Sequence, residues 1–174
     1  MIKYIQHLLL GRELFMDGAC CQQLDDLDYQ ILSILFNDSR TPFLEIARQC
    51  HVSGGTIHVR MKKMEELGII RGTKLIVDNS KLGYDICCFI GVKLDNTSDS
   101  SKVQESLSKI NEIIELHYTT GEYSFFVKVL CKNVSHLQDI LMRKIQSIHG
   151  VQSTNTFISL SKPIDRNIEL EKMY

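Results

Sequence analysis

The residues best suited to chemistry in this sequence are short polar and basic side chains between positions 53 and 71. Serine and threonine hydroxyls hydrogen-bond to phosphates and base edges, and glycines let backbone N–H groups approach a phosphate at the start of a helix. Arginine and lysine supply phosphate contacts, or for one arginine a guanine contact. The candidate nucleic-acid contacts are Ser53, Gly54, Gly55, Thr56, His58, Arg60, Lys62, Lys63 and Arg71.

The distribution of charge favours this interpretation, although the formal net charge of the chain is only −1. Residues 40–74 hold seven Lys or Arg and three Glu, a local excess of +4, whereas residues 20–39 hold four Asp and no basic residue. A basic patch on a neutral protein can bind phosphates locally. Two alternatives remain open: a basic stripe is also typical of a solvated helix face, and Arg60 could be a structural arginine paired with an acid of the first helix.

Hydrophobic periodicity predicts two helices ahead of the basic cluster. The first begins at Leu24, with Asp25 as its cap and further aspartates in its first turn, where the helix dipole favours anions. The second is short and opens at Thr41 and Pro42, a capping hydroxyl followed by a proline at the first helical position.

A third helix should carry the basic cluster itself. It follows a turn at 51–52, is capped by Ser53, ends near Leu67 and buries a stripe of Ile57, Met61 and Met64. A short helix, a tight turn and a helix with one buried and one polar face are typical of a helix-turn-helix. Residues 69–77 look like a strand after this motif, which would give a winged-helix-like domain.

The second half of the chain predicts the element order β-α-β-β-α-β, which is the ferredoxin-like arrangement. Strands are expected near 86–94, 113–119, 123–131 and 151–160. Two helices can cover only one face of such a sheet, so Phe126 and Leu130 would stay exposed on the other face. A second copy of the chain is the simplest partner for that face. The expected fold class is therefore α+β.

Other classes of function find little support. No apolar run approaches the roughly 20 residues of a membrane helix, and the N-terminus carries no clear secretory signal. None of the six cysteines forms a C-x-x-C pair, so we expect reduced thiols in a cytoplasmic protein and no metal site. There is no nucleophile elbow or P-loop, and the histidines lack partners at useful spacing, so we expect no enzyme and no cofactor.

Several short motifs, taken together and in order, resemble the Lrp/AsnC family of transcription regulators between Leu24 and Leu160. Each motif alone is weak, but their joint order and spacing are specific. They are Leu24-Asp25-x-x-Asp28, Asn37-Asp38-Ser39-Arg40-Thr41, Glu45-Ile46-Ala47, Ser53-x-x-Thr56-x-x-x-Arg60, Gly68-Ile69-Ile70-x-Gly72, Leu82-Gly83 and Thr120-Gly121-Glu122-Tyr123.

The asparagine-responsive branch of the family is the most similar one. Many members of the wider family have aspartate after the tyrosine of the sensing turn, where this chain has Ser124, and this departure puts a leucine-type ligand site in doubt. Further similarity to that branch lies in Gly55–Arg60, Gly83–Asp85, Cys88–Gly91, Tyr118–Gly121 and Gln152–Thr154.

The resemblance implies an amino-acid effector bound between subunits, at the Gly121 turn and the start of the last strand. Turn amides would receive the effector carboxylate, and asparagine is the leading candidate. A plain hairpin with a glycine at its turn is the alternative. The implied effector residues are Tyr118, Thr119, Thr120, Gly121, Glu122, Tyr123, Gln152, Ser153 and Thr154.

The resemblance also implies a homodimer on double-stranded DNA, assembling further to an octamer in the bacterial cytoplasm and associated with the nucleoid. The alternative of the same fold is a ligand-independent architectural DNA-binding protein. The expected divisions are an N-terminal extension at 1–19, a helix-turn-helix domain at 20–77, a linker at 78–84, an effector-binding and oligomerisation domain at 85–162 and a C-terminal tail at 163–174. Met16 is the alternative start of the protein.

Overall fold

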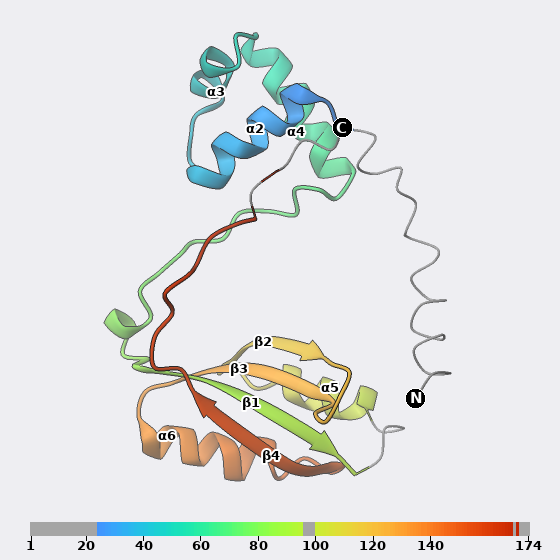
Figure 1. The fold of residues 1–174 in the computed structure, drawn as a ribbon, viewed down its shortest axis with the longest axis vertical. Coiled ribbons are helices and arrows are strands. Elements are labelled where there is room, and N and C mark those ends of the chain that lie inside the picture. The colour runs from blue at the N-terminus through green and yellow to red at the C-terminus, as the bar shows by residue number, and fades with distance from the viewer. Residues whose placement is uncertain (1–23, 96–99, 169, 171–174) are drawn as a thin grey trace. The chain divides into compact units, whose positions relative to one another are not determined.

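The chain divides into two compact units, which are described separately (Figure 1). The computed structural model describes residues 24–95, 100–168 and 170, so the predicted extension at 1–19 lies outside the described residues. Among the described residues, one unit contains 24–75 together with 166–168 and 170, and the other unit lies within Ile76–Asp165. Part of the segment predicted as a C-terminal tail therefore packs with the first unit, where Leu170 contacts the apolar core.

The first unit begins with helix α2 (Asp26–Asn37), and its cap confirms the sequence prediction. The Asp25 carboxylate accepts hydrogen bonds from the backbone N–H groups of Leu27 and Asp28, both at 3.1 Å. The Asp28 carboxylate in turn accepts a hydrogen bond from the Asp25 N–H at 3.2 Å. This reciprocal pair satisfies N–H groups that the first turn of a helix otherwise leaves without a partner.

The predicted threonine cap of the second helix is wrong. Helix α3 (Phe43–Gln49) has Pro42 at the cap position without any side-chain hydrogen bond. The Thr41 hydroxyl donates instead to the Asp38 carbonyl at 2.8 Å, which closes the preceding turn. Because Pro42 takes the cap position, the Thr41 hydroxyl lies one residue ahead of the place from which a side chain accepts hydrogen bonds from the N–H groups of the first turn.

Helix α4 (Gly54–Glu66) follows a tight turn in which His51 has a φ of 56°, in the left-handed region. The Ser53 side chain accepts a hydrogen bond from the Thr56 N–H at 3.1 Å, so the predicted serine cap is confirmed. The helices α2, α3 and α4 enclose a small core made of Ile31, Leu32, Ile46, Ala47, Ile57 and Met64.

The strand predicted over residues 69–77 is wrong, because the structure gives this segment no regular element. Ile69 and Ile70 pack against the helical core, but Leu75 and Ile76 are 67% and 87% exposed. A strand needs a neighbour to take up its backbone hydrogen bonds, and this segment pairs with no strand in the described part of the chain. A short 3-10 helix, η2 (Ser80–Leu82), then precedes the sheet.

The second unit confirms the predicted ferredoxin-like order. Four antiparallel strands pair in the order β2-β3-β1-β4, and the helices pack on one face of the sheet. The side chains between the sheet and these helices form the larger core, which contains Ile90, Val127 and Ile140. The elements are β1 (Ile86–Leu94), α5 (Ser100–Ser108), β2 (Ile113–Tyr118), β3 (Phe125–Cys131), α6 (Val134–Asp139), its π-helical continuation η4 (Ile140–Ile145) and β4 (Val151–Ile158).

The other face of the sheet carries aromatic side chains, and no described α-helix covers it. The Phe126 ring of β3 contacts the rings of Phe89 of β1 and Phe157 of β4, with centroids 6.0 Å and 6.3 Å away. The Tyr123 ring lies directly over Gly91, where a Cβ atom would come within 2.6 Å of it. Phe126 is half-buried by these neighbours, while Phe157 remains exposed. We call this surface the open face.

Candidate nucleic-acid interface and effector turn

The first turn of α4 presents small polar groups, as the sequence predicted. Gly55 is exposed, and the hydroxyls of Ser53 and Thr56 lie 2.8 Å apart, in hydrogen-bond contact. His58 is exposed, and its ring meets the edge of Phe43 of α3 at 4.9 Å between centroids. A Cβ atom at Gly54 would come within 3.2 Å of a Leu44 methyl group, so the glycine lets α3 and α4 pack closely.

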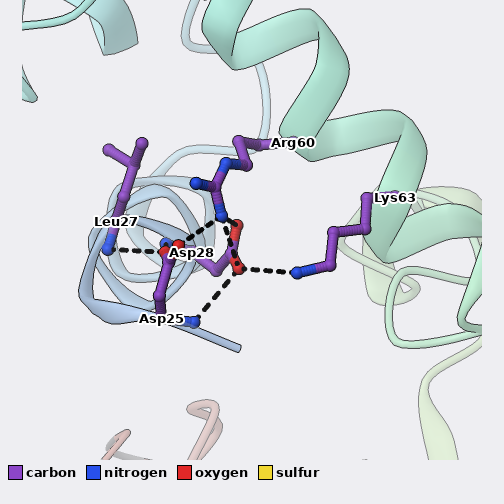
Figure 2. Close-up of polar contacts among 5 residues, drawn as sticks. All are labelled: Asp25, Leu27, Asp28, Arg60 and Lys63. Carbon is purple, nitrogen blue, oxygen red and sulfur yellow. Dashed lines mark hydrogen bonds and ion pairs between the residues drawn. The ribbon is translucent and has the colours of Figure 1, made fainter. Parts of the chain in front are cut away.

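Arg60 leaves this surface and points toward α2 instead (Figure 2). Its Nη1 donates to the Asp25 carboxylate, and also to Asp28 Oδ2 at 3.3 Å. Lys63 Nζ lies 3.6 Å from the same Asp28 oxygen. These four side chains, which we call the α2–α4 ionic cluster, join the cap of the first helix to the middle of α4.

Burial explains why the cluster needs two cations. The Asp28 side chain is 0% exposed, and the Arg60 side chain is 28% exposed. A buried carboxylate is costly unless it is paired and hydrogen-bonded. Arg60, Lys63 and the Asp25 N–H together supply those contacts. These contacts therefore support a structural role for Arg60, in which it pairs with acids of the first helix, over a role as a DNA contact.

The pKa values of the partners follow the same contacts. Burial by itself would raise the pKa of Asp25, but the Asp28 N–H and the Arg60 guanidinium outweigh it and lower that pKa below its ordinary 3.8. The hydrogen bond to Asp25 raises the pKa of Arg60. Both shifts favour the charged forms, so the pair is an ion pair at neutral pH.

The remaining predicted basic contacts stay at the surface. The Lys62 side chain is 77% exposed and pairs only loosely with Glu66, at 3.6 Å. Arg71 is exposed in the irregular segment after α4. Arg48 of α3 is also exposed, but Glu45 holds it through two hydrogen bonds at 3.0 and 2.8 Å. Of the four basic residues predicted to contact DNA, Lys62 and Arg71 are thus the two most exposed to solvent.

The predicted effector turn is an exposed connection between β2 and β3. The Thr119 hydroxyl donates to the Tyr123 carbonyl at 2.7 Å, and Gly121 has a φ of 111°, which favours glycine. In the described residues, the backbone amides of Thr120, Gly121 and Glu122 donate no hydrogen bond within the protein. These amides lie at the surface, where an anion can reach them.

Two predicted effector residues have structural contacts of their own. The Tyr123 ring belongs to the open face, and its hydroxyl accepts a hydrogen bond from the Asn155 side chain at 3.0 Å. The Tyr118 ring packs at a tilt on buried Phe125, with centroids 5.2 Å apart. The structure thus gives both tyrosines packing contacts within the chain.

The start of β4 lies on the other side of β1 from the turn. Val92 of β1 pairs with Phe125 on one side and with Thr154 on the other. Since neighbouring strands lie about 4.8 Å apart, the strands that carry the two halves of the predicted site are about 10 Å apart, although the Tyr123 side chain reaches Asn155 of β4. Gln152 and Ser153 are exposed there, and the Thr154 hydroxyl accepts a hydrogen bond from Gln146 at 2.8 Å. One chain alone does not bring these residues into contact with the turn.

Neither a metal site nor a membrane helix is found in the part of the chain that the structure describes. No group of His, Cys, Asp and Glu there is arranged to hold a metal ion. No described helix combines the length and the apolar character needed to cross a bilayer. A cavity of about 360 Å³ lies between η2 and the sheet, lined by Asn79, Leu82, Tyr84, Asn111, Glu112, Ile114 and Leu130, outside the predicted effector set.

Comparison with known proteins decides the family. An AsnC-type helix-turn-helix domain matches residues 24–65, and an Lrp/AsnC ligand binding domain matches residues 87–168. Regulatory protein AsnC of Haemophilus influenzae is 49% identical over 146 residues, which cover 84% of this chain and 97% of that protein. The chain belongs to the Lrp/AsnC family. It is a DNA-binding transcription regulator with a ligand-binding domain, as the sequence predicted.

Solved structures of transcription regulators share its fold. The structure of Escherichia coli AsnC is 44% identical, has a TM-score of 0.80 and covers 84% of this chain and 99% of its own. The regulator NMB0573 of Neisseria meningitidis, solved as a complex with L-Met, has a TM-score of 0.78 at 22% identity and covers 85% of this chain and 96% of its own.

Replacing Arg60 and Lys62 separately should distinguish their roles in this Lrp/AsnC regulator. We expect Arg60→Met to reduce the free energy of unfolding of the helical unit by about 2–3 kcal/mol, less than the roughly 3–5 kcal/mol of a fully buried pair because Arg60 keeps some exposure. Lys62→Met is the matched control, and as a surface change it should stay within about 0.5 kcal/mol. Urea unfolding measures the loss, and amide hydrogen exchange should place it in α2 and α4. Equal stability of both variants would contradict the assignment.

The lowered pKa of Asp25 predicts a pH dependence of stability. A carboxylate with a depressed folded-state pKa contributes stability above its unfolded pKa, near 3.8, and that contribution is lost as the pH falls through the folded value. Asp25→Asn keeps a good helix cap but removes the charge. The stability difference between wild type and Asp25→Asn, measured by urea unfolding, should be largest at pH 5–7 and shrink below about pH 4. A difference that does not change with pH would count against the ion pair.

Proposed function

We propose that this Lrp/AsnC regulator binds its operator as a homodimer through the exposed face of α4. Two copies of α4 would enter the major groove at half-sites about one DNA turn apart. The observation that carries the proposal is the make-up of the first turn of α4, where Gly55, Thr56 and His58 are accessible and Lys62 follows on the exposed side. Ser53, Gly54 and Arg71 complete the proposed contact surface. Arg60 and Lys63 contribute to this surface mainly indirectly, because their pairing in the α2–α4 ionic cluster holds α4 in place.

The dimer is proposed to form through the open face of the sheet. Phe89, Phe126 and Phe157 present neighbouring aromatic surface there, and no described α-helix of the same chain covers it. An apolar sheet face that is left exposed favours association, and a twofold pairing lets the same residues meet each other.

A charge on the open face should dissociate the dimer. We expect Phe126→Glu to convert the full chain to a folded monomer, because burying an unpaired carboxylate in the interface is unfavourable. Met142→Glu is the control, since Met142 is an exposed apolar residue of η4 and should leave the mass unchanged. Sedimentation velocity gives the mass and circular dichroism checks the fold. An unchanged mass for Phe126→Glu would contradict the proposed interface.

We further propose that L-asparagine is the effector and that it binds between subunits. The amides of Thr120, Gly121 and Glu122, which donate to no other described residue, suit its carboxylate, and the Glu122 side chain suits its ammonium group. Gln152, Ser153 and Thr154 of another subunit would complete the site and hydrogen-bond the side-chain amide. The relatives named AsnC and the L-Met complex of NMB0573 support an amino acid in this domain.

A thermal-shift screen of the full chain against the twenty amino acids tests the effector. Asparagine at about one hundred times its Kd should stabilise the folded state by about 2.7 kcal/mol, because it binds only that state. We expect Gly121→Trp to abolish the shift and Glu122→Gln to reduce it. A comparable shift with another amino acid instead would overturn asparagine as the effector.

Effector binding is proposed to alter the assembly of dimers into an octamer, and with it the spacing of the α4 helices and the operator affinity. The regulator would act in the bacterial cytoplasm, associated with the nucleoid. The alternative is a ligand-independent architectural protein of the same fold. It would bind DNA with steep salt dependence and little sequence preference, and would show no thermal shift with any amino acid.

A further inference from the structure

An apolar side chain stands at the centre of the exposed face of α4. Val59 is 69% exposed, whereas Ile57 and Met64 on the opposite side of the helix are fully buried. With 3.6 residues per turn, Val59 lies on the same side as Gly55, one turn earlier, and Lys62, one turn later. Since Gly55 has no side chain, no side chain covers Val59 from the preceding turn of the helix on this side.

The α2–α4 ionic cluster makes this surface more accessible. Arg60 directly follows Val59 in sequence, but Asp25 and Asp28 hold its guanidinium at the side of α2 (Figure 2). Lys63, the next cation on that side, also approaches Asp28. The long cations next to Val59 are therefore directed toward α2, and the valine methyl groups face outward.

The surroundings of Val59 specify the kind of partner. His58 and Thr56 flank it with polar groups, Lys62 follows with a charge, and the segment around α4 carries the excess of positive charge found in residues 40–74. A basic and polar rim around a single apolar group fits the DNA major groove, where thymine adds a 5-methyl group to a row of polar base edges and phosphates.

We propose that Val59 is a specificity-determining residue that packs against the 5-methyl group of a thymine in the operator. The inference rests on the proposed DNA contact of α4 and adds a base preference that the polar residues do not provide. Thr56 and His58 can hydrogen-bond to several base edges, whereas a methyl contact distinguishes thymine from the other three bases.

Replacement of thymine by deoxyuridine tests the contact, because it removes only the 5-methyl group. Duplexes that bind the wild-type full chain are first selected from a random library, and each thymine of the selected site is then replaced singly. In the wild type, we expect one deoxyuridine position in each half-site to weaken binding by about three- to four-fold, the value of one buried methyl group. In Val59→Ala the same replacement should change affinity by less than about 1.5-fold.

Two matched variants complete the experiment. Val59→Thr keeps a methyl group at the same position and should retain most of the deoxyuridine effect. Lys62→Ala should weaken binding to all duplexes and lower the salt dependence while leaving the thymine-to-deoxyuridine ratio unchanged. Circular dichroism confirms that each variant is folded, as expected for exposed positions.

The possible results distinguish failure of the Val59–thymine contact from failure of the proposed DNA contact of α4. If Val59→Ala keeps the wild-type deoxyuridine effect at every position, or if the wild type shows none, Val59 does not read thymine although α4 still binds DNA. If the wild type selects no sequence and Lys62→Ala binds DNA as well as wild type, the proposed contact surface of α4 is itself wrong, and the inference falls with it.

Discussion

A four-stranded sheet with its α-helices packed on one face has no described α-helix on the opposite face, and the proposed action of this protein depends on that constraint. The strands alternate their side chains, so the same strands that supply Ile90 and Val127 to the core supply Phe89 and Phe126 to the open face. Apolar surface of this kind is stabilised by a partner. A dimer built on it would fix the separation of two DNA-binding units and create the subunit boundaries at which an effector can act.

The DNA-binding unit is held by a different kind of interaction. Its apolar core is small, and the contact between α2 and α4 is reinforced by the α2–α4 ionic cluster around the buried Asp28. The same carboxylates that cap α2 also orient α4, so one short acidic segment serves both local and tertiary structure. The consequence for function is a division of the basic residues. Some cations anchor the helix within the protein, and others, Lys62 above all, remain exposed on the surface proposed to contact DNA.

The local signals of the sequence predicted most of the fold. Caps at Asp25 and Ser53 were identified correctly because the hydrogen bonds that they make lie within one helical turn. The order of strands and helices in the second unit followed from alternating and helical periodicity. The Thr41 cap was wrong because the helix begins one residue later than the pattern suggested, with Pro42 at the cap position. The strand at 69–77 was wrong because strand propensity does not supply the neighbouring strand that a strand requires.

For the candidate sites too, the sequence predicted the local features, and the tertiary structure was needed for the rest. By itself the sequence determined the helix-turn-helix, the ferredoxin-like order, the polar first turn of α4 and the glycine turn at 121, since each depends on residues close together in the chain. The tertiary structure decided which of two roles the contacts of Arg60 support, because its acidic partners lie more than thirty positions away. It also decided that Val59 faces outward and that β1 separates the effector turn from Gln152–Thr154. Burial and long-range pairing are properties of the packed chain, and no local pattern of residues specifies them.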